Sequence, residues 1–245
     1  MRETLRGRRR TFQVFVEEGP YAGVAVGEVE TWIEAARRQH GREGVAPPKI
    51  TLLPADELGA RLGTSDHQGL GAEVEEYPYV DADRLLREHD LVVALDRVQD
   101  PQNLGAIVRT AEGAGAAIVI PRHRAASVTA AVVRASAGAT EHAAIAQVRN
   151  LADFLTAAKK AGFWIYGAAA EAPNAYDASD YRDRTVYVLG SEGEGLARRV
   201  SETCDQLIGV PLRGRVESLN VSVTAGILLY EALRQRRPRL PELSE

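Results

Sequence analysis

The chain has 245 residues, of which 45% are hydrophobic and 26% are charged, and its formal net charge at pH 7 is −4. This composition is typical of a folded globular protein with room for two modest domains, and it excludes a chain that is disordered throughout. The negative net charge excludes nucleic-acid binding by the whole surface, so any such partner must meet local basic patches.

Two arginine clusters near the chain ends are candidate patches: Arg2, Arg6, Arg8, Arg9 and Arg10, and Arg234, Arg236, Arg237 and Arg239. Runs of this length are usually solvated termini, so by themselves they decide nothing. Cys204 is the only cysteine, which excludes an intrachain disulfide and indicates the cytoplasm. We expect no signal peptide, membrane helix or metal site, because the chain lacks a long apolar run and its histidines are scattered.

Composition changes predict two domains. An apolar run at 49–54, KITLLP, predicts a buried strand in a small first α/β domain, and a polar stretch with Pro78 follows near Glu75. We therefore expect a first domain over 1–75, a linker over 76–88 and a second domain over 89–245.

Strands and helices alternate along the second domain. The predicted strands are 91–96, 116–121, 163–170, 185–190 and 206–211, and the predicted helices are 103–115, 128–136, 151–162, 196–204 and Asn220 to about Arg237. Such alternation, with strands apolar on both faces, predicts an α/β fold with a parallel sheet covered by helices on both sides. Ligands bind at the carboxyl ends of such strands, so the loops after 91–96, 185–190 and 206–211 are candidate sites.

The first loop leads into the helix of DRVQDPQNLGAIVRTAEGAG. At 100° per residue, Arg109 projects away from the apolar stripe and lies beside Gly105 and Gly113. These glycines favour a backbone or a ligand that comes close. The alternative is a turn at Asp100, a helix cap at Asn103 and a merely solvated arginine.

The second loop, in TVYVLGSEGEGL, does not have the G-x-G-x-x-G spacing of a dinucleotide fingerprint, which disfavours a nicotinamide enzyme. Its glycines could let main-chain groups contact an adenosine, or form a plain turn with Glu192 and Glu194 at the surface. In the third segment, Ser218 and Asn220 precede a helix that is apolar around most of its circumference. We expect Asn220 to cap that helix, and a second subunit to cover it at Leu229 and Leu233.

The three segments together resemble the motifs of the SpoU (TrmH-like) family of the SPOUT class of RNA methyltransferases. The matching residues are D-P-x-N-x-G-A-I-x-R-T-A from Asp100, L-G-S-E-G-E-G-L from Leu189 and S-L-N-V-S-V from Ser218. The stretch SDHQGLGAEV at 65–74 also resembles the RNA-binding domain of the branch that methylates a guanosine of 23S ribosomal RNA. The resemblance implies a deep trefoil knot, a homodimer, and transfer of a methyl group from S-adenosyl-L-methionine to a ribose 2′-hydroxyl.

The resemblance also implies residue roles. The implied catalytic residues are Asn103, Arg109, Glu192, Ser218 and Asn220. The implied cofactor-binding residues are Leu189, Gly190, Ile208, Val210, Pro211, Leu212, Ser218, Leu219, Asn220 and Val221. Arg109 is expected to stabilise a developing alkoxide and to contact phosphate, and its role as a base is open because a guanidinium normally stays protonated.

Three alternatives stay open. The same chemistry could act on transfer RNA, or the chain could be a catalytically silent RNA-binding or ribosome-assembly protein that keeps the fold. The third alternative is a nucleotide-dependent oxidoreductase built on a doubly wound sheet. The missing G-x-G-x-x-G dinucleotide fingerprint disfavours this alternative.

Overall fold

The structure is a computed structural model that describes residues 1–7, 9–41, 46–191 and 193–237. The chain divides into two compact units, Met1–Pro78 and Tyr79–Glu245. The expected linker is shorter than 76–88, because Ala82–Glu88 forms helix α4 and belongs to the second unit. Asp81 caps this helix by accepting a hydrogen bond from the backbone N–H of Arg84.

The first unit is a small mixed sheet with helices. Its strands are β1 (Thr11–Glu17), β2 (Lys49–Leu53) and β3 (Leu70–Val74), in the order β2-β1-β3. Strand β1 runs parallel to β2 and antiparallel to β3. Its helices are α1 (Arg2–Arg6), α2 (Ala22–Gln39) and α3 (Ala55–Leu62). Side chains of α1, β1 and α2 form one core, namely Leu5, Val14, Val16, Val29 and Ile33.

The second unit contains a seven-stranded sheet in the order β6-β5-β4-β9-β7-β10-β8. Its strands are β4 (Leu91–Asp96), β5 (Ala117–Pro121), β6 (Ile145–Val148), β7 (Trp164–Ala168), β8 (Asn174–Ala175), β9 (Thr185–Gly190) and β10 (Gln206–Gly209). Every strand pair in this sheet is parallel, as the sequence predicts. Asp96 pairs with Gly190, so the loops after β4 and β9 begin side by side.

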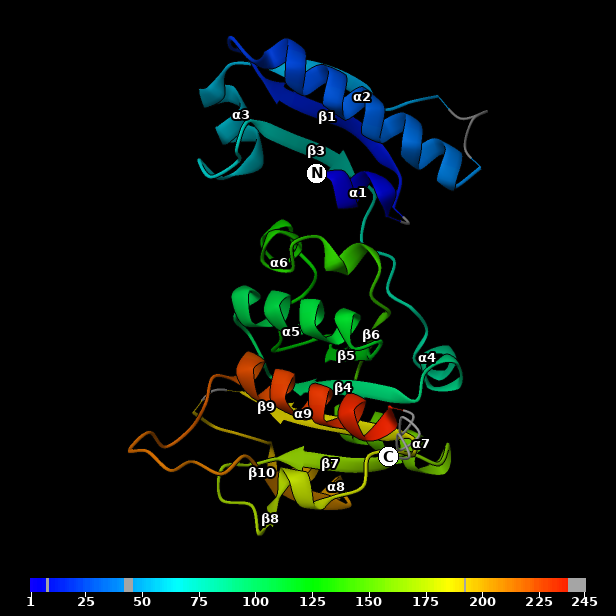
Figure 1. Ribbon diagram of the computed structural model, residues 1–245, viewed down its shortest axis with the longest axis vertical. Helices are drawn as coiled ribbons and strands as arrows, with labels where there is room; N and C mark the ends of the chain where they lie inside the picture. The colour runs from blue at the N-terminus through cyan, green and yellow to red at the C-terminus, as the bar shows by residue number, and fades with distance from the viewer. Residues whose placement is uncertain (8, 42–45, 192, 238–245) are drawn as a thin grey trace, which may run out of the picture. The chain divides into compact units, whose positions relative to one another are not determined.

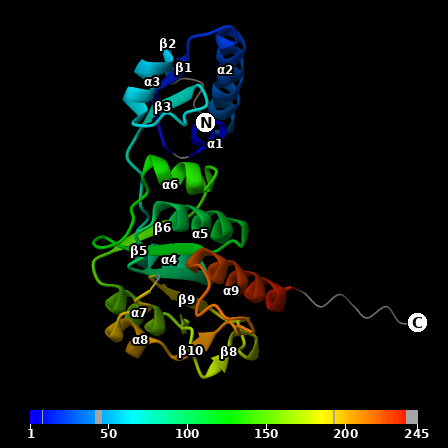
Figure 2. The same cartoon turned by 90° about the vertical axis from the view of Figure 1, so that its left-hand side faces the viewer.

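Helices cover both faces of this sheet (Figures 1 and 2). They are α4, α5 (Pro101–Gly113), α6 (Ala130–Ala135), α7 (Leu151–Lys160), α8 (Arg198–Thr203) and α9 (Val221–Arg236), with short 3-10 turns at Ala139–Glu141 and Tyr176–Ala178. Leu85 of α4, Leu155 of α7 and Val200 of α8 share one apolar cluster with alternate residues of the central strands. Helices α5 and α9 lie next to each other on the opposite face. Within the described residues, no helix has the length and hydrophobicity needed to cross a membrane.

The arginines near the end of α9 are partly structural. Arg236 donates hydrogen bonds to the carbonyls of Tyr181 (2.8 Å) and Asp183 (2.6 Å), and burial lowers the pKa of its guanidinium. Arg234 forms an ion pair with Glu231 at 2.7 Å. Two arginines of the second cluster, Arg234 and Arg236, are therefore engaged with their own chain. Arg239 of the second cluster and Arg8 of the first lie outside the described residues.

Candidate active site

A large hollow lies where β7, β9 and β10 end. Its volume is about 920 Å³, and the loop after β9, the loop after β10 and the start of α9 form its walls. The described residues that line it include Leu189, Gly190, Ile208, Val210, Leu212, Ser218, Leu219 and Val221. Pro211 and Asn220, which the resemblance also assigns to the cofactor, are not among the lining residues. Two of the three predicted loops thus meet around one ligand-sized space.

A smaller hollow of about 320 Å³ adjoins the large one. The loop after β4 supplies most of its wall, through Arg97, Val98, Gln99, Asp100 and Asn103. Ser191, Glu194 and Val221 line both spaces. The small hollow is rich in polar side chains, so it suits a hydrophilic group held next to whatever fills the large one.

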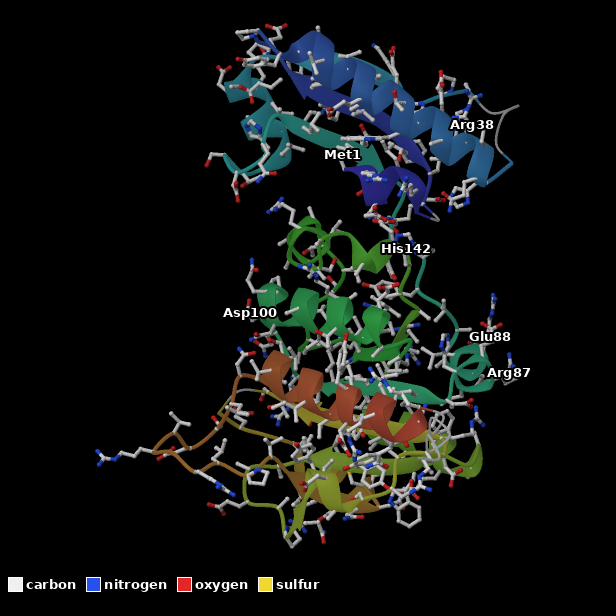
Figure 3. The ribbon with its side chains drawn as sticks, viewed as in Figure 1. Met1, Arg38, Arg87, Glu88, Asp100 and His142 are labelled. Atoms are coloured by element: carbon white, nitrogen blue, oxygen red, sulfur yellow. The ribbon has the colours of Figure 1, made fainter. Side chains whose placement is uncertain are left out.

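Two asparagine side chains join the first and third segments. The Asn220 side-chain amide donates to Asn103 Oδ1 at 2.9 Å, although the residues are 117 positions apart. Asn220 Oδ1 accepts from the backbone N–H of Ser222 at 2.8 Å, so Asn220 is the N-cap of α9, as predicted. Asn103 is not a cap, because Asp100 starts α5 by accepting from the backbone N–H of Gln102, with Pro101 in the first turn. Figure 3 labels Asp100 at this end of α5.

Arg109 lies apart from both hollows. It is exposed on α5, as its position opposite the apolar stripe predicts, and it lines neither hollow. Gly105 is explained by packing, since a Cβ there would lie 2.3 Å from the Cβ of Ala135 on α6. The close approach predicted from this glycine is therefore made by the chain's own helix. Glu192, another predicted catalytic residue, lies outside the described residues.

The glycine loop after β9 folds back on its own strand. A Cβ at Gly190 would lie 2.2 Å from the carbonyl carbon of Gly195, and Ser191 forms a bridge with Gly195. Gly193 and Gly195 have φ values of +92° and +63°, which an L side chain rarely adopts. Gly190 is thus needed for the loop to close on its own strand, in addition to lining the large hollow.

Sequence reasoning missed several lining residues. The segment from Ala168 to Glu171, directly after β7, lines the large hollow. The rule that ligands bind at the carboxyl ends of parallel strands would have found it, had it been applied to the predicted strand 163–170. Arg97 and Glu194 also line the small hollow, and Asp96 accepts a hydrogen bond from the backbone N–H of Ala197; none of these three was predicted from the sequence to have a role in the site.

Cys204 and metal chemistry offer no alternative site. Burial raises the pKa of the Cys204 thiol to about 12, so a reactive thiolate is scarce at neutral pH. Among the residues that the structure describes, no group of three or more His, Cys, Asp or Glu side chains could hold a metal ion.

An all-parallel sheet with a ligand-sized hollow at the carboxyl ends of its strands defines an α/β enzyme of the kind that binds a nucleotide-like cofactor there. Residues 90–230 match the SpoU rRNA Methylase family. The chain is 39% identical over 243 residues to the putative TrmH family tRNA/rRNA methyltransferase YacO of Bacillus subtilis. The aligned region covers 96% of this chain and 93% of that protein. The chain therefore belongs to the SpoU rRNA methylase family, and the family expected from the three motifs is confirmed.

Solved structures share the fold. The AdoMet-bound rRNA methyltransferase from Sinorhizobium meliloti is 25% identical, with a TM-score of 0.75 over 97% of this chain and 84% of that one. AviRb from Streptomyces viridochromogenes, at 23% identity and a TM-score of 0.74, covers 96% of this chain and 86% of its own, and indicates the fold alone. The A. aeolicus TrmH/SpoU tRNA modifying enzyme is 32% identical over 66% of this chain and 88% of its own, with a TM-score of 0.56. Similar proteins thus include enzymes named for either RNA.

Proposed function

We propose that this protein methylates a ribose 2′-hydroxyl of RNA with S-adenosyl-L-methionine, and that its target is a guanosine of 23S ribosomal RNA. The observation that carries the proposal is the convergence of the loops after β9 and β10 and the start of α9 on one hollow, next to the loop after β4. Three segments far apart in the sequence, which carry the family motifs, thus build two adjoining hollows.

The large hollow fits the cofactor. Its volume of about 920 Å³ lies in the range that holds a nucleoside-sized ligand. Its walls combine apolar side chains such as Leu189, Ile208 and Leu219 with small residues and exposed main chain, which suits an adenosine that is held largely by backbone groups. When bound, S-adenosyl-L-methionine supplies an activated methyl group on its sulfonium. Leu189, Gly190, Ile208 and Val210 would hold it from the sheet side, and Leu212 and Ser218 to Val221 from the other.

The small polar hollow would take the acceptor ribose. A ribose hydroxyl is a weak nucleophile, so the protein must orient it and help to remove its proton. Ser218 lines the large hollow and Asn103 lines the small one, and Asn220 holds Asn103 in place. We assign these side chains to orienting the ribose at the boundary between the hollows. By the family resemblance, Glu192 would anchor that arrangement.

Arg109 would reach the site from a second copy of the chain, since it lines neither hollow of its own chain. On α9, Val223, Ile227 and Tyr230 have the spacing of one helix face, and Val223 (50%) and Tyr230 (53%) are exposed. Thr110 and Gly113 of α5 lie beside this face of α9. A homodimer that buries the face would bring Arg109 to the interface, where it could stabilise the developing alkoxide and contact phosphate. The trefoil knot and a cytoplasmic location stay predictions.

The choice of target RNA comes from the first unit. The similarity of 65–74 to the 23S guanosine branch favours ribosomal RNA, whereas relatives are named for tRNA and rRNA together. Mapping 2′-O-methylation in ribosomal and transfer RNA from cells with and without the gene would identify the nucleotide. Loss of a methyl group from transfer RNA alone would contradict the 23S assignment.

Arg109→Ala tests the mechanism. We expect methyl transfer to be abolished while the calorimetric affinity for S-adenosyl-L-methionine stays within a few-fold, because Arg109 is exposed and distant from the hollow of its own chain. Arg109→Lys should not restore activity if methyl transfer requires a bidentate contact between the guanidinium and a phosphate. Arg134→Ala, at an exposed arginine on neighbouring α6, is the matched control and should be fully active. Unfolding of Arg109→Ala, or loss of cofactor binding, would contradict the assignment.

A further inference from the structure

Arg97 has a backbone conformation that few side chains adopt. It directly follows β4, and its φ is +60°. Only a few per cent of non-glycine residues have positive φ, and glycine would adopt the same conformation without a steric cost. An arginine held in this conformation therefore indicates that its side chain makes contacts that offset the strain.

The guanidinium of Arg97 makes those contacts with the glycine loop after β9. It donates through Nη1 to the carboxylate of Glu194 at 2.5 Å, and through Nη2 to the carbonyl of Gly195 at 3.3 Å. Its buried Nε lies 3.5 Å from Asp96 Oδ1. Asp96, in turn, accepts from the backbone N–H of Ala197 at 2.6 Å. Arg97 therefore holds the loop after β9, and Asp96 holds the residue at which the chain leaves that loop, Ala197.

Apart from the bridge between Ser191 and Gly195, the described residues of this loop have few other anchors. Gly193, Glu194 and Gly195 are exposed, and no residue among them contributes to the apolar core. Ser191 and Glu194 nevertheless form part of the wall between the large and small hollows. The position of this wall therefore depends on polar contacts, and Arg97 supplies two of them.

We propose that Arg97 is a positioning residue that clasps Glu194 and Gly195, in the loop after β9, against β4 and so preforms the wall of the cofactor hollow. This inference rests on the proposed function, since it takes the large hollow to be the S-adenosyl-L-methionine site. Arg97 acts on the cofactor through the loop, because its guanidinium is engaged by Glu194 and Gly195 and it lines the small hollow but not the large one. Without the contacts of Arg97, S-adenosyl-L-methionine would have to order the loop when it binds, which would lower its affinity.

Arg97→Gly removes the clasp and leaves a residue that accepts the same φ. Isothermal titration of the full-length protein with S-adenosyl-L-methionine, without RNA, should show affinity lowered about tenfold, the loss expected for one hydrogen bond to a charged group. The KM for the cofactor should rise with it, while the unfolding temperature changes little. Glu194→Gln should have a smaller effect, because the contact to Gly195 remains. It should add almost nothing in the Arg97→Gly background, since the two changes remove the same contact.

Arg198→Ala is the matched control, because Arg198 pairs with Glu202 within exposed α8 and lines neither hollow. Its cofactor affinity should equal that of the wild type. Unchanged affinity in both Arg97→Gly and Glu194→Gln would overturn the clasp. A clear fall in the unfolding temperature of Arg97→Gly would also overturn it, because Arg97 would then be a general structural residue. Failure of the wild type to bind S-adenosyl-L-methionine would instead contradict the proposed function.

Discussion

The side chain of Asn220 makes two hydrogen bonds with different roles. Its carbonyl oxygen caps α9, and its amide nitrogen holds Asn103 of α5. Asn220→Asp keeps the cap and removes the donor, whereas Asn220→Ala removes both. We expect Asn220→Ala to lower the free energy of unfolding by about 1 kcal/mol, the usual loss for a helix cap. Asn220→Asp should unfold close to the wild-type temperature and still transfer methyl groups at least tenfold more slowly, since about 1.4 kcal/mol of transition-state stabilisation would be lost.

The comparison of these two variants separates folding from positioning. Thermal unfolding gives the first quantity, and single-turnover methylation of RNA gives the second. If Asn220→Asp reacts as fast as the wild type, the contact with Asn103 has no part in the reaction. The sequence left a helix cap open as the alternative interpretation of Asn103 and favoured one at Asn220, and only Asn220 is a cap, because Asp100 and Pro101 begin α5 before Asn103. A local pattern can identify a capping residue type, but it cannot show which of two neighbouring candidates starts the helix.

At the scale of elements, the sequence predicted the strongly apolar strands and the longer helices of the second unit, and it missed β6, β8 and α4 there. In the first unit it predicted only strand β2, and it missed the long helix α2 and the other elements. β6 has four residues and β8 has two, too few for a periodic pattern to stand out. The polar composition of 82–88 suggested a linker, yet Leu85 and Leu86 are buried against the second unit's core. The loops after β4 and β9 could be placed together from the rule for parallel strands, but the bonds from Arg97 to the second loop depend on tertiary structure.

The structure corrects the dimer interface that the sequence predicted on helix α9. Leu229, expected to face a partner, is fully buried within its own chain, and Leu233 is half-buried. The exposed apolar face is instead that of Val223 and Tyr230. The sequence showed that the helix was apolar on many sides, but only the packing shows which sides its own sheet covers.

Tyr230→Glu tests this face. If a second copy covers α9, sedimentation should show the dimer dissociation constant raised at least about tenfold, because a large side chain that loses its burial forgoes roughly 1.5–3 kcal/mol. Activity should fall in parallel, since Arg109 would no longer reach the partner's site. Trp164→Glu, at an aromatic residue that is 52% exposed on β7, is the matched control and should leave the dimer intact. A fully active Tyr230→Glu monomer would contradict the interface.

At the scale of the whole molecule, the negative net charge conceals a basic surface on the first unit. Arg9, Arg10 and Arg37 line a common hollow there, and His40 at the end of α2 contacts the carbonyl of Arg6 at 2.6 Å. The first arginine cluster is therefore joined by arginines from the end of α2, where Figure 3 labels Arg38. Arg9 itself is buried, so the positive charge that this surface presents to a phosphate backbone comes from Arg10 together with Arg37 and Arg38.

Deletion of residues 1–78 tests whether this first unit supplies RNA affinity. The second unit has its own apolar core and includes all of 90–230, the part that matches the family, so we expect it to fold and to bind S-adenosyl-L-methionine as the whole chain does. Its Kd for RNA should rise at least about tenfold. The dependence of RNA affinity on salt should also become shallower, by about 0.7–0.9 in log–log slope for each phosphate that the protein no longer neutralises. In the full chain, Arg10→Glu with Arg38→Glu should change RNA binding in the same direction, whereas Arg84→Glu, on exposed α4, should not. If the truncated protein methylates RNA as fast as the whole chain, the basic surface of the first unit does not bind the substrate, and recognition must lie within the second unit.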